Sequence, residues 1–250
     1  MITILIKLIA AHLIGDFLLQ TDKICETKYS NKRSERLIGL GIHSGIQAIL
    51  SYVFIAEWTL WTVPLVIFTS HFVIDFVKVV CNGRSLPALL VDQLAHYIVI
   101  IALWWLLFAK CWCNTYASYL SLSFWAILTS YIAVLAPTSI LIKSFIEFEG
   151  WIPGQSLSPA ESSQPEESLQ GLPNAGKWIG YLERVLILTF IYTGNVEGIG
   201  FLLAAKSVFR FGELNRTQDI KVTEYVLIGT FVSFTIAIVI GFGVKWLIVG

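Results

Sequence analysis

Histidines and aspartates recur with a regular spacing inside the apolar segments of this chain. Three pairs are four residues apart: His12 with Asp16, His71 with Asp75, and Asp92 with His96. Residues four apart share one face of a helix. Because the third pair has the reverse order, antiparallel helices would place the imidazoles at one depth and the carboxylates at another. A fourth histidine, His43, shares a helix face with Gln47.

These residue types favour a metal site within a membrane. Neutral imidazole and carboxylate are ligands for zinc and other divalent first-row metals. A charged aspartate near the centre of a membrane helix costs about 2.5–3.5 kcal/mol, which a bound cation would offset. We predict a divalent metal cofactor, zinc or another first-row transition metal, as one ion or two. The candidate ligands are His12, His43, His71, His96, Asp16, Asp75 and Asp92.

The same carboxylates are the candidate catalytic groups. Asp16, Asp75 or Asp92 could act as the general base on a metal-bound water instead of being a ligand. The alternative is a cluster without metal, in which each histidine donates a hydrogen bond to an aspartate and orients the helices. His43 has the least support as a ligand, because no aspartate lies four residues from it.

Basic residues near helix ends suggest a second site. Lys78, Arg184, Lys206 and Arg210 could together bind a phosphate or another anionic head group, since arginine offers two parallel donors. The alternative is that these side chains anchor the helices at the membrane surface. Arg184 fits this alternative least, because it lies deepest in its segment.

The composition indicates an all-α, polytopic transmembrane helical bundle whose main partner is the lipid bilayer. Hydrophobic residues make up 56% of the 250 residues, charged residues 14%, and the mean hydropathy is +0.74. The formal net charge of zero gives no indication of a nucleic-acid partner. Seven to eight segments are predicted, at residues 2–20, 37–56, 59–80, 88–109, 118–141, 178–193, 196–211 and 225–249. The sixth and seventh are short and could form a re-entrant pair.

The chain divides into three parts: a five-helix membrane part (1–146) with the His/Asp cluster, a polar acidic loop (147–177) and a C-terminal membrane part (178–250). Lysines and arginines between residues 21 and 36 predict a cytoplasmic loop and an N-terminus outside. We expect a multi-pass protein of the bacterial inner membrane. The acidic loop could bind a cytoplasmic partner, and a homo-oligomer is compatible with the pattern. Gly39, Gly41 and Gly45 would permit close helix contacts.

Several motifs resemble a family of bacterial membrane proteins, the domain-of-unknown-function family numbered three-three-zero-seven. In the first part they are the segment from His12 to Gln20, His71 with Asp75 and Lys78, and Asp92 to His96. In the last part they are residues 180–184, 199–201, 205–207, 224–225 and 229–230. The family implies membrane insertion but no particular reaction. The His/Asp spacing is also similar to that of membrane-bound metal-dependent hydrolases.

Three functions fit this pattern. The first is metal-dependent hydrolysis of a lipid-linked or membrane-partitioning substrate. The second is a transporter or channel that binds a metal ion or relays protons, which would require access to the site from the outer face. The third is a structural or signalling membrane protein, for which alanine at His71 would lower stability without changing metal content.

Overall fold

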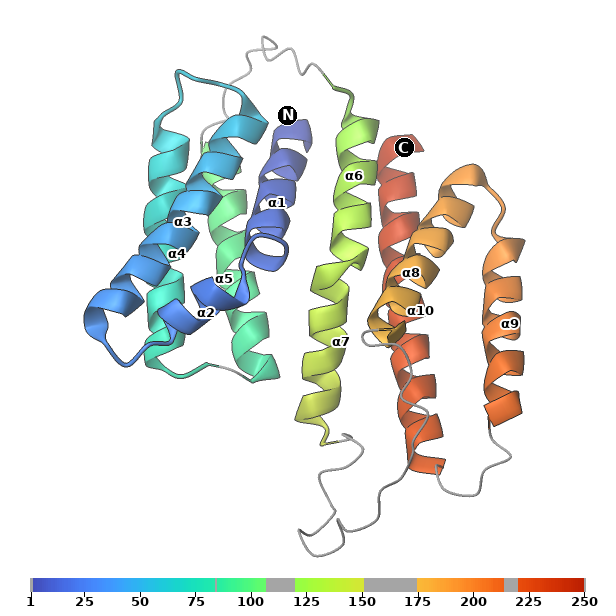
Figure 1. The fold of residues 1–250 in the computed structure, drawn as a ribbon. Helices are drawn as coiled ribbons and strands as arrows, with labels where there is room; N and C mark the ends of the chain where they lie inside the picture. The colour runs from blue at the N-terminus through green and yellow to red at the C-terminus, as the bar shows by residue number, and fades with distance from the viewer. Residues whose placement is uncertain (1, 84, 107–119, 151–174, 214–219, 250) are drawn as a thin grey trace, which may run out of the picture. The chain divides into compact units, whose positions relative to one another are not determined.

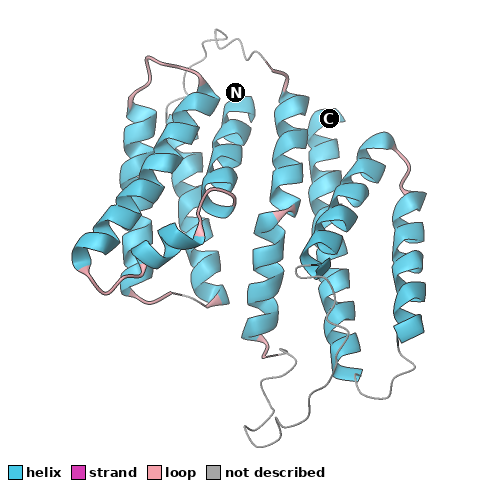
Figure 2. Ribbon diagram, viewed as in Figure 1, coloured by secondary structure: helices cyan, strands magenta, loops and turns pink. Residues whose placement is uncertain are grey.

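The protein is helical throughout the part of the chain that the structure describes. This computed structural model describes residues 2–83, 85–106, 120–150, 175–213 and 220–249 (Figure 1). All regular structure in these ranges is helix (Figure 2). The chain forms two compact units, Met1–Pro137 and Thr138–Gly250.

The first unit is a helical bundle. Its helices are α1 (Ile2–Phe17), α2 (Asp22–Lys28), α3 (Arg33–Ile55), α4 (Thr62–Val80), α5 (Leu86–Trp104) and α6 (Leu122–Val134). The helix α1 packs against α3, α5 and α6, while α4 packs against both α3 and α5. After α1 the chain bends by 82° into α2, which crosses the bundle and packs on α3 (Figure 1).

Four helices of this unit present an inward-facing stripe that repeats every fourth residue and changes from apolar to polar along the bundle; all its residues are buried except Asp16, which is half-buried. The stripes are Ile4, Leu8, His12 and Asp16 in α1; Ile55, Ser51, Gln47 and His43 in α3; Val63, Ile67, His71 and Asp75 in α4; and Ile100, His96 and Asp92 in α5. The apolar ends form one core with Leu103. The direction of the stripes shows that α1 and α4 run opposite to α3 and α5, so all polar ends meet at one end of the bundle.

The number of membrane spans is smaller than the sequence suggested. Five helical stretches of the described chain are long and apolar enough to cross a membrane: Arg33–Ile55, Thr62–Val80, Leu86–Trp104, Leu122–Phe148 and Val226–Val249. The bent pair α1 and α2 would make six. The prediction of seven to eight spans is therefore wrong. The helix α8 (Ala175–Thr193) carries three charges, and α9 (Glu197–Glu213) has only 17 residues.

Large apolar side chains on the outer faces of these helices support membrane insertion. In α4 they include Leu65, Val73 and Val77, which are 52%, 59% and 54% exposed. Exposed apolar surface of this extent is typical of contact with lipid. The structure therefore indicates a multi-pass membrane protein.

Two predicted segments differ in their local structure. The region 21–36 contains α2, which begins where the Thr21 hydroxyl accepts a hydrogen bond from the backbone of Ile24. The predicted helix 118–141 is interrupted at Leu135, where α6 ends before α7 (Ala136–Phe148) begins. Most of the predicted polar loop, residues 151–174, lies outside the described residues.

The second unit contains most of α7 with α8, α9 and α10 (Ile220–Val249). The helix α8 packs against α9 and α10. Gly194, with a φ of 84°, lies in the turn between α8 and α9, where a left-handed conformation favours glycine. A β-carbon at Gly241 would lie 2.6 Å from the side chain of Ile191, so this glycine permits the close contact of α10 with α8.

Candidate metal centre

Three imidazole rings meet inside the first unit. The ring centroids of His71 and His96 are 4.0 Å apart, and His12 lies 5.2 Å from His71 and 5.1 Å from His96. Each of the three residues is 1% exposed. The structure thus brings together three of the histidines predicted to share one depth.

The fourth histidine lies closer to the carboxylates. His43 Nε2 is 3.2 Å from Asp16 Oδ1 and 3.5 Å from Asp75 Oδ2, whereas its ring centroid is 6.2 Å from that of His71. His43 therefore contacts the carboxylates of Asp16 and Asp75 more closely than it contacts the other imidazoles. Gln47, one turn from His43, donates hydrogen bonds to Asp16 and to the backbone oxygen of His12. An added β-carbon at Gly15 would collide with the Gln47 amide, so this glycine leaves room for that side chain beside α1.

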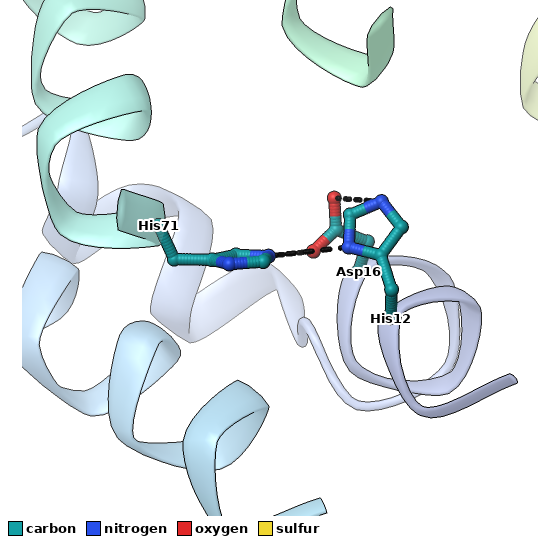
Figure 3. Close-up of side chains that lie close together, drawn as sticks. All are labelled: His12, Asp16 and His71. Carbon is teal, nitrogen blue, oxygen red and sulfur yellow. Dashed lines mark hydrogen bonds and ion pairs between the residues drawn. The ribbon is translucent and has the colours of Figure 1, made fainter. Parts of the chain in front are cut away.

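Asp16 lies at the centre of the site. Figure 3 shows its carboxylate between His12 and His71; each of these histidines has a ring nitrogen 3.8 Å from one of its oxygens. Gln47 donates a hydrogen bond to Oδ1, and Gln93 donates one of 2.9 Å to Oδ2. No lysine or arginine of the described chain lies within 4 Å of this carboxylate. Its close neighbours are therefore imidazoles, amides and a second carboxylate, that of Asp92, which lies within 4.8 Å.

The other two aspartates are each paired with a lysine. Lys28 Nζ donates to Asp75 Oδ2 at 2.7 Å, and both side chains are 4% exposed. Lys78 Nζ donates to Asp92 Oδ2 at 2.6 Å. These ion pairs offset the charge of both carboxylates, which leaves Asp16 as the strongest candidate for holding a cation.

Lys28 is a site residue that the sequence did not reveal, because it was counted only as a marker of a cytoplasmic loop. The helix α2 brings it to Asp75, which is 47 residues away in the chain. A signal for α2 was present: Thr21 followed by Asp22 is a favourable helix start. No sequence pattern predicted that α2 packs against α3.

Hydrogen-bond partners fix the protons on two of the histidines. Carboxylates only accept, so the Gln93 amide nitrogen faces Asp16 Oδ2 and Asp92 Oδ2, at 2.9 and 3.3 Å. The Gln93 Oε1 atom then accepts from His12 Nε2 at 3.2 Å. His12 Nδ1 must therefore be the acceptor of its 3.1 Å contact with His71 Nε2, which leaves the lone pair of His71 on Nδ1.

Several buried atoms of the cluster have no hydrogen-bond partner among the described residues. They are His43 Nδ1, His71 Nδ1, His96 Nε2, Gln47 Oε1 and Asp92 Oδ1. His43 Nε2 has only its 3.2 Å contact with Asp16 Oδ1. Buried polar atoms normally have a partner, and an atom without one calls for an explanation such as an ion or a ligand. This set is rich in the nitrogen and oxygen atoms that bind divalent metals.

Two groups of ligand atoms are close enough to hold a metal ion: His12, Asp16 and His71 in one, and Asp16, Asp92 and His96 in the other. Within each group the ligand atoms lie within 4.8 Å of one another. Metal–ligand bonds of 2.0–2.1 Å place neighbouring ligands of a tetrahedral ion about 3.3 Å apart. The residues present therefore fit a divalent cation after small side-chain shifts.

The predicted anion-binding residues have other partners. Lys78 is bound to Asp92 in the first unit, and Lys206 Nζ donates to Glu183 Oε2 at 2.7 Å in the second. The Arg184 guanidinium, 3% exposed, donates to the hydroxyls of Ser233 and Ser139 at 2.9 and 2.6 Å. The side chain of Arg210 lies outside the described residues. These contacts support a structural role of the lysines, and the anion site stays a prediction.

Comparison with known proteins identifies one family. Residues 4–125 match the family model described as Protein of unknown function (DUF3307). The match covers all residues of the His/Asp cluster and confirms the resemblance over the first part. Similarity to membrane-bound hydrolases receives no support from it. No curated protein and no solved structure matches the chain.

Proposed function

We propose that the first unit binds a divalent first-row metal ion, zinc or a similar cation, through His12, Asp16 and His71. The observation that carries this proposal is the environment of Asp16. Its side chain is 8% exposed and bears a charge that no lysine or arginine of the described chain offsets, while three imidazoles lie within 3.8 Å. A buried charge is costly unless it is paired or bound to a metal.

Metal binding would move a proton in this group. His71 Nε2 donates to His12 Nδ1, so the proton lies between these two nitrogens. An imidazole binds a metal through its unprotonated nitrogen, so His71 would bind through Nε2 only after this proton has moved to Nδ1, as the other neutral tautomer. Gln93 and Gln47 would continue to orient His12 and Asp16 from outside the ligand set.

We infer further that the metal serves hydrolysis of a lipid-linked or membrane-partitioning substrate. Such a metal lowers the pKa of water and polarises an ester oxygen. Water would add to the electrophilic atom of the ester while a carboxylate of the cluster accepts one of its protons. The leaving oxygen would take that proton as the ester bond breaks. Asp75 and Asp92, as well as Asp16, remain candidates for this carboxylate. Location within helices whose outer faces are apolar supports a substrate that enters from the bilayer.

The first test is elemental analysis of protein purified in detergent without chelator and then resupplied with zinc. We expect about one bound ion or more per chain in the wild type, and a loss of at least one ion in His71→Ala. Trp125→Leu is the control, since it also removes a buried aromatic ring of the first unit but lies outside the His/Asp cluster. Background metal in all three folded proteins would contradict the proposal and favour the metal-free hydrogen-bonded cluster.

The second arm of this test measures activity. A lipid phosphate ester and a lipid acyl ester in mixed micelles serve as probes, and the metal is removed with a chelator and then restored. Turnover that disappears and returns with the metal supports hydrolysis. Metal binding without turnover of either probe would leave the metal site in place but favour transport.

A second candidate function is ion or proton transport, because the cluster contains a continuous row of hydrogen-bonded groups. The row passes from His71 through His12 and Gln93 to Asp16 and Gln47. It joins α1, α3, α4 and α5. The imidazoles of His71 and His12 and the carboxylate of Asp16 could exchange protons without a metal, while the two glutamines orient them. Uptake of zinc or protons by proteoliposomes containing the protein, lost in Asp16→Asn, would support this function over hydrolysis.

A further inference from the structure

Asp16 belongs to both groups of ligand atoms, and its two oxygens face different neighbours. Oδ1 lies 3.8 Å from His71 Nε2, while Oδ2 shares the amide nitrogen of Gln93 with Asp92 Oδ2. Oδ2 also lies 3.8 Å from His12 Nε2, so both oxygens face the first group and Oδ2 faces the second group as well. A carboxylate in this position can bridge two cations.

His96 is prepared as a ligand for the second group. Its Nδ1 atom lies 2.9 Å from the backbone oxygen of Asp92, and because a carbonyl only accepts, Nδ1 must carry the proton. The lone pair is then on Nε2, which is buried and has no hydrogen-bond partner in the described part of the chain. Metal-binding histidines commonly donate the other ring N–H to a backbone carbonyl in this way.

Asp92 also has one oxygen to spare. Its Oδ2 atom accepts hydrogen bonds from Lys78 and Gln93, at 2.6 and 3.3 Å. Its Oδ1 atom is buried without a hydrogen-bond partner among the residues described and lies 3.9 Å from His96 Nδ1. The carboxylate can thus keep its lysine on one oxygen and bind a cation with the other.

We propose that a second divalent cation binds to Asp16, Asp92 and His96, with Asp16 as the bridge to the ion held by His12 and His71. This inference rests on the proposed metal site and extends it from one ion to two. Two ions about 3.5–4 Å apart form the centre of many phosphatases, nucleases and aminopeptidases. Three protein ligands leave room for water or substrate on the second ion.

The charges predict that the second ion binds more weakly than the first. The first ion compensates the uncompensated charge of Asp16, whereas the second approaches Asp92, whose charge Lys78 already offsets. The Lys78 ammonium is 22% exposed and repels a cation at this position. Replacing Lys78 should therefore strengthen the second site and leave the first nearly unchanged.

The experiment is a titration of metal-depleted, detergent-purified protein with Mn²⁺, followed by electron paramagnetic resonance and elemental analysis. The wild type should bind two ions per chain, and the spectrum should show exchange coupling between two manganese ions that share a carboxylate. This measurement needs no variant. Absence of bound Mn²⁺, and of Zn²⁺ in the first test, would overturn the proposed metal function. One ion per chain at saturation would overturn only the second site, and two uncoupled ions would overturn the bridge.

Variants assign the second ion to its residues. His96→Ala should bind one ion with an uncoupled spectrum, and Asp92→Asn should do the same if His96→Ala fails to fold. Lys78→Met should bind the second ion at least about tenfold more tightly, because a like charge is removed. Lys143→Met is the control: this lysine is 77% exposed and belongs to the second unit. A second ion that remains in folded His96→Ala and Asp92→Asn would contradict the assignment, and so would an unchanged affinity in Lys78→Met.

Discussion

The residues of the site differ chiefly in how their charges are offset. Two of the three aspartates, Asp75 and Asp92, form an ion pair with a lysine. The buried pair of Lys28 with Asp75 lies at the polar end of the bundle. Desolvation makes such a pair expensive to break, because removal of one partner leaves an uncompensated charge. Lys28 therefore has a structural role that its position in a short basic segment does not suggest.

Replacing Lys28 tests this role. Lys28→Met should destabilise the protein by about 3–5 kcal/mol, because the Asp75 carboxylate would stay buried without its ammonium partner. Thermal and denaturant unfolding in detergent would measure the loss. The double variant Lys28→Met with Asp75→Leu should recover most of it, since it removes both charges.

Lys32→Met is the matched control, since this lysine pairs with Glu35 at 2.9 Å but is 77% exposed. Its melting temperature should equal that of the wild type, because exposed ion pairs contribute little. Equal melting temperatures for Lys28→Met and Lys32→Met would show that the buried pair is unimportant for stability.

Residue spacing predicted the site only in part, for a physical reason. The four-residue interval of His12 with Asp16 and of Asp92 with His96 depends on local helix geometry, which the sequence determines directly. The contacts of Lys28 and His43 depend on how α2 and α3 pack, and no local pattern encodes this. The pairing of Asp75 with Lys28 joins residues that are 47 positions apart and could not be read from either segment.

Among the helices, α2 differs most from the prediction, because the sequence predicted a loop between residues 21 and 36. It packs on α3 at Gly39, where an added β-carbon would lie 2.7 Å from the backbone nitrogen of Lys28 and 2.9 Å from the carbonyl carbon of Thr27. Of the three glycines expected to permit close contacts in this helix, only Gly39 does so. Gly41 and Gly45 have no atom within 4 Å of an added β-carbon in the part of the chain that is described.

Gly39→Ala should therefore push α2 away from α3. We expect a loss of about 1–3 kcal/mol, the usual range for overpacking, and faster thiol labelling of Cys25 in α2. Cys25 now accepts a hydrogen bond from Gln20 at 3.1 Å. The labelling experiment uses a background in which Cys81, Cys111 and Cys113 are serine.

Gly41→Ala is the control in the same helix. Its stability should be unchanged or higher by up to about 1 kcal/mol, because alanine favours the helix and meets no neighbour. If Gly39→Ala behaves like Gly41→Ala in both measurements, close packing at Gly39 does not hold α2 in place.

Hydrophobicity predicted α3, α4 and α5 well because these helices are long and carry few charges. It overestimated α8 and α9, which have an apolar face but fail as spans for different reasons: charge in α8 and length in α9. Local hydropathy takes no account of the ion pair that Glu183 of α8 forms with Lys206 of α9. The prediction of helices was thus better than the prediction of spans.

For the whole molecule, the number of spans is five or six, depending on whether α1 crosses the membrane. This helix has 16 residues, or about 24 Å at 1.5 Å per residue, which is shorter than the roughly 30 Å of a bilayer core. However, α1 packs against α3, α5 and α6, and its stripe from Ile4 to Asp16 runs beside the stripes of α3 and α5. We therefore expect α1 to cross the membrane, with α2 at the cytoplasmic boundary.

Six spans place both ends of the sequence on the same side of the membrane, whereas five place them on opposite sides. The basic residues between 21 and 36 predict that this shared side is the outside. Reporter fusions at each end, one type active only in the cytoplasm and the other only outside it, would measure the topology. A fusion in the turn at residues 57–61, expected outside, is the internal control, because both candidate counts include α3 and α4. Ends on opposite sides would contradict the six-span topology.

A cytoplasmic N-terminus would also mean that α1, with His12 and Asp16, enters and leaves the membrane on one face. Substrate or ions could then reach the site only from that face or from the bilayer.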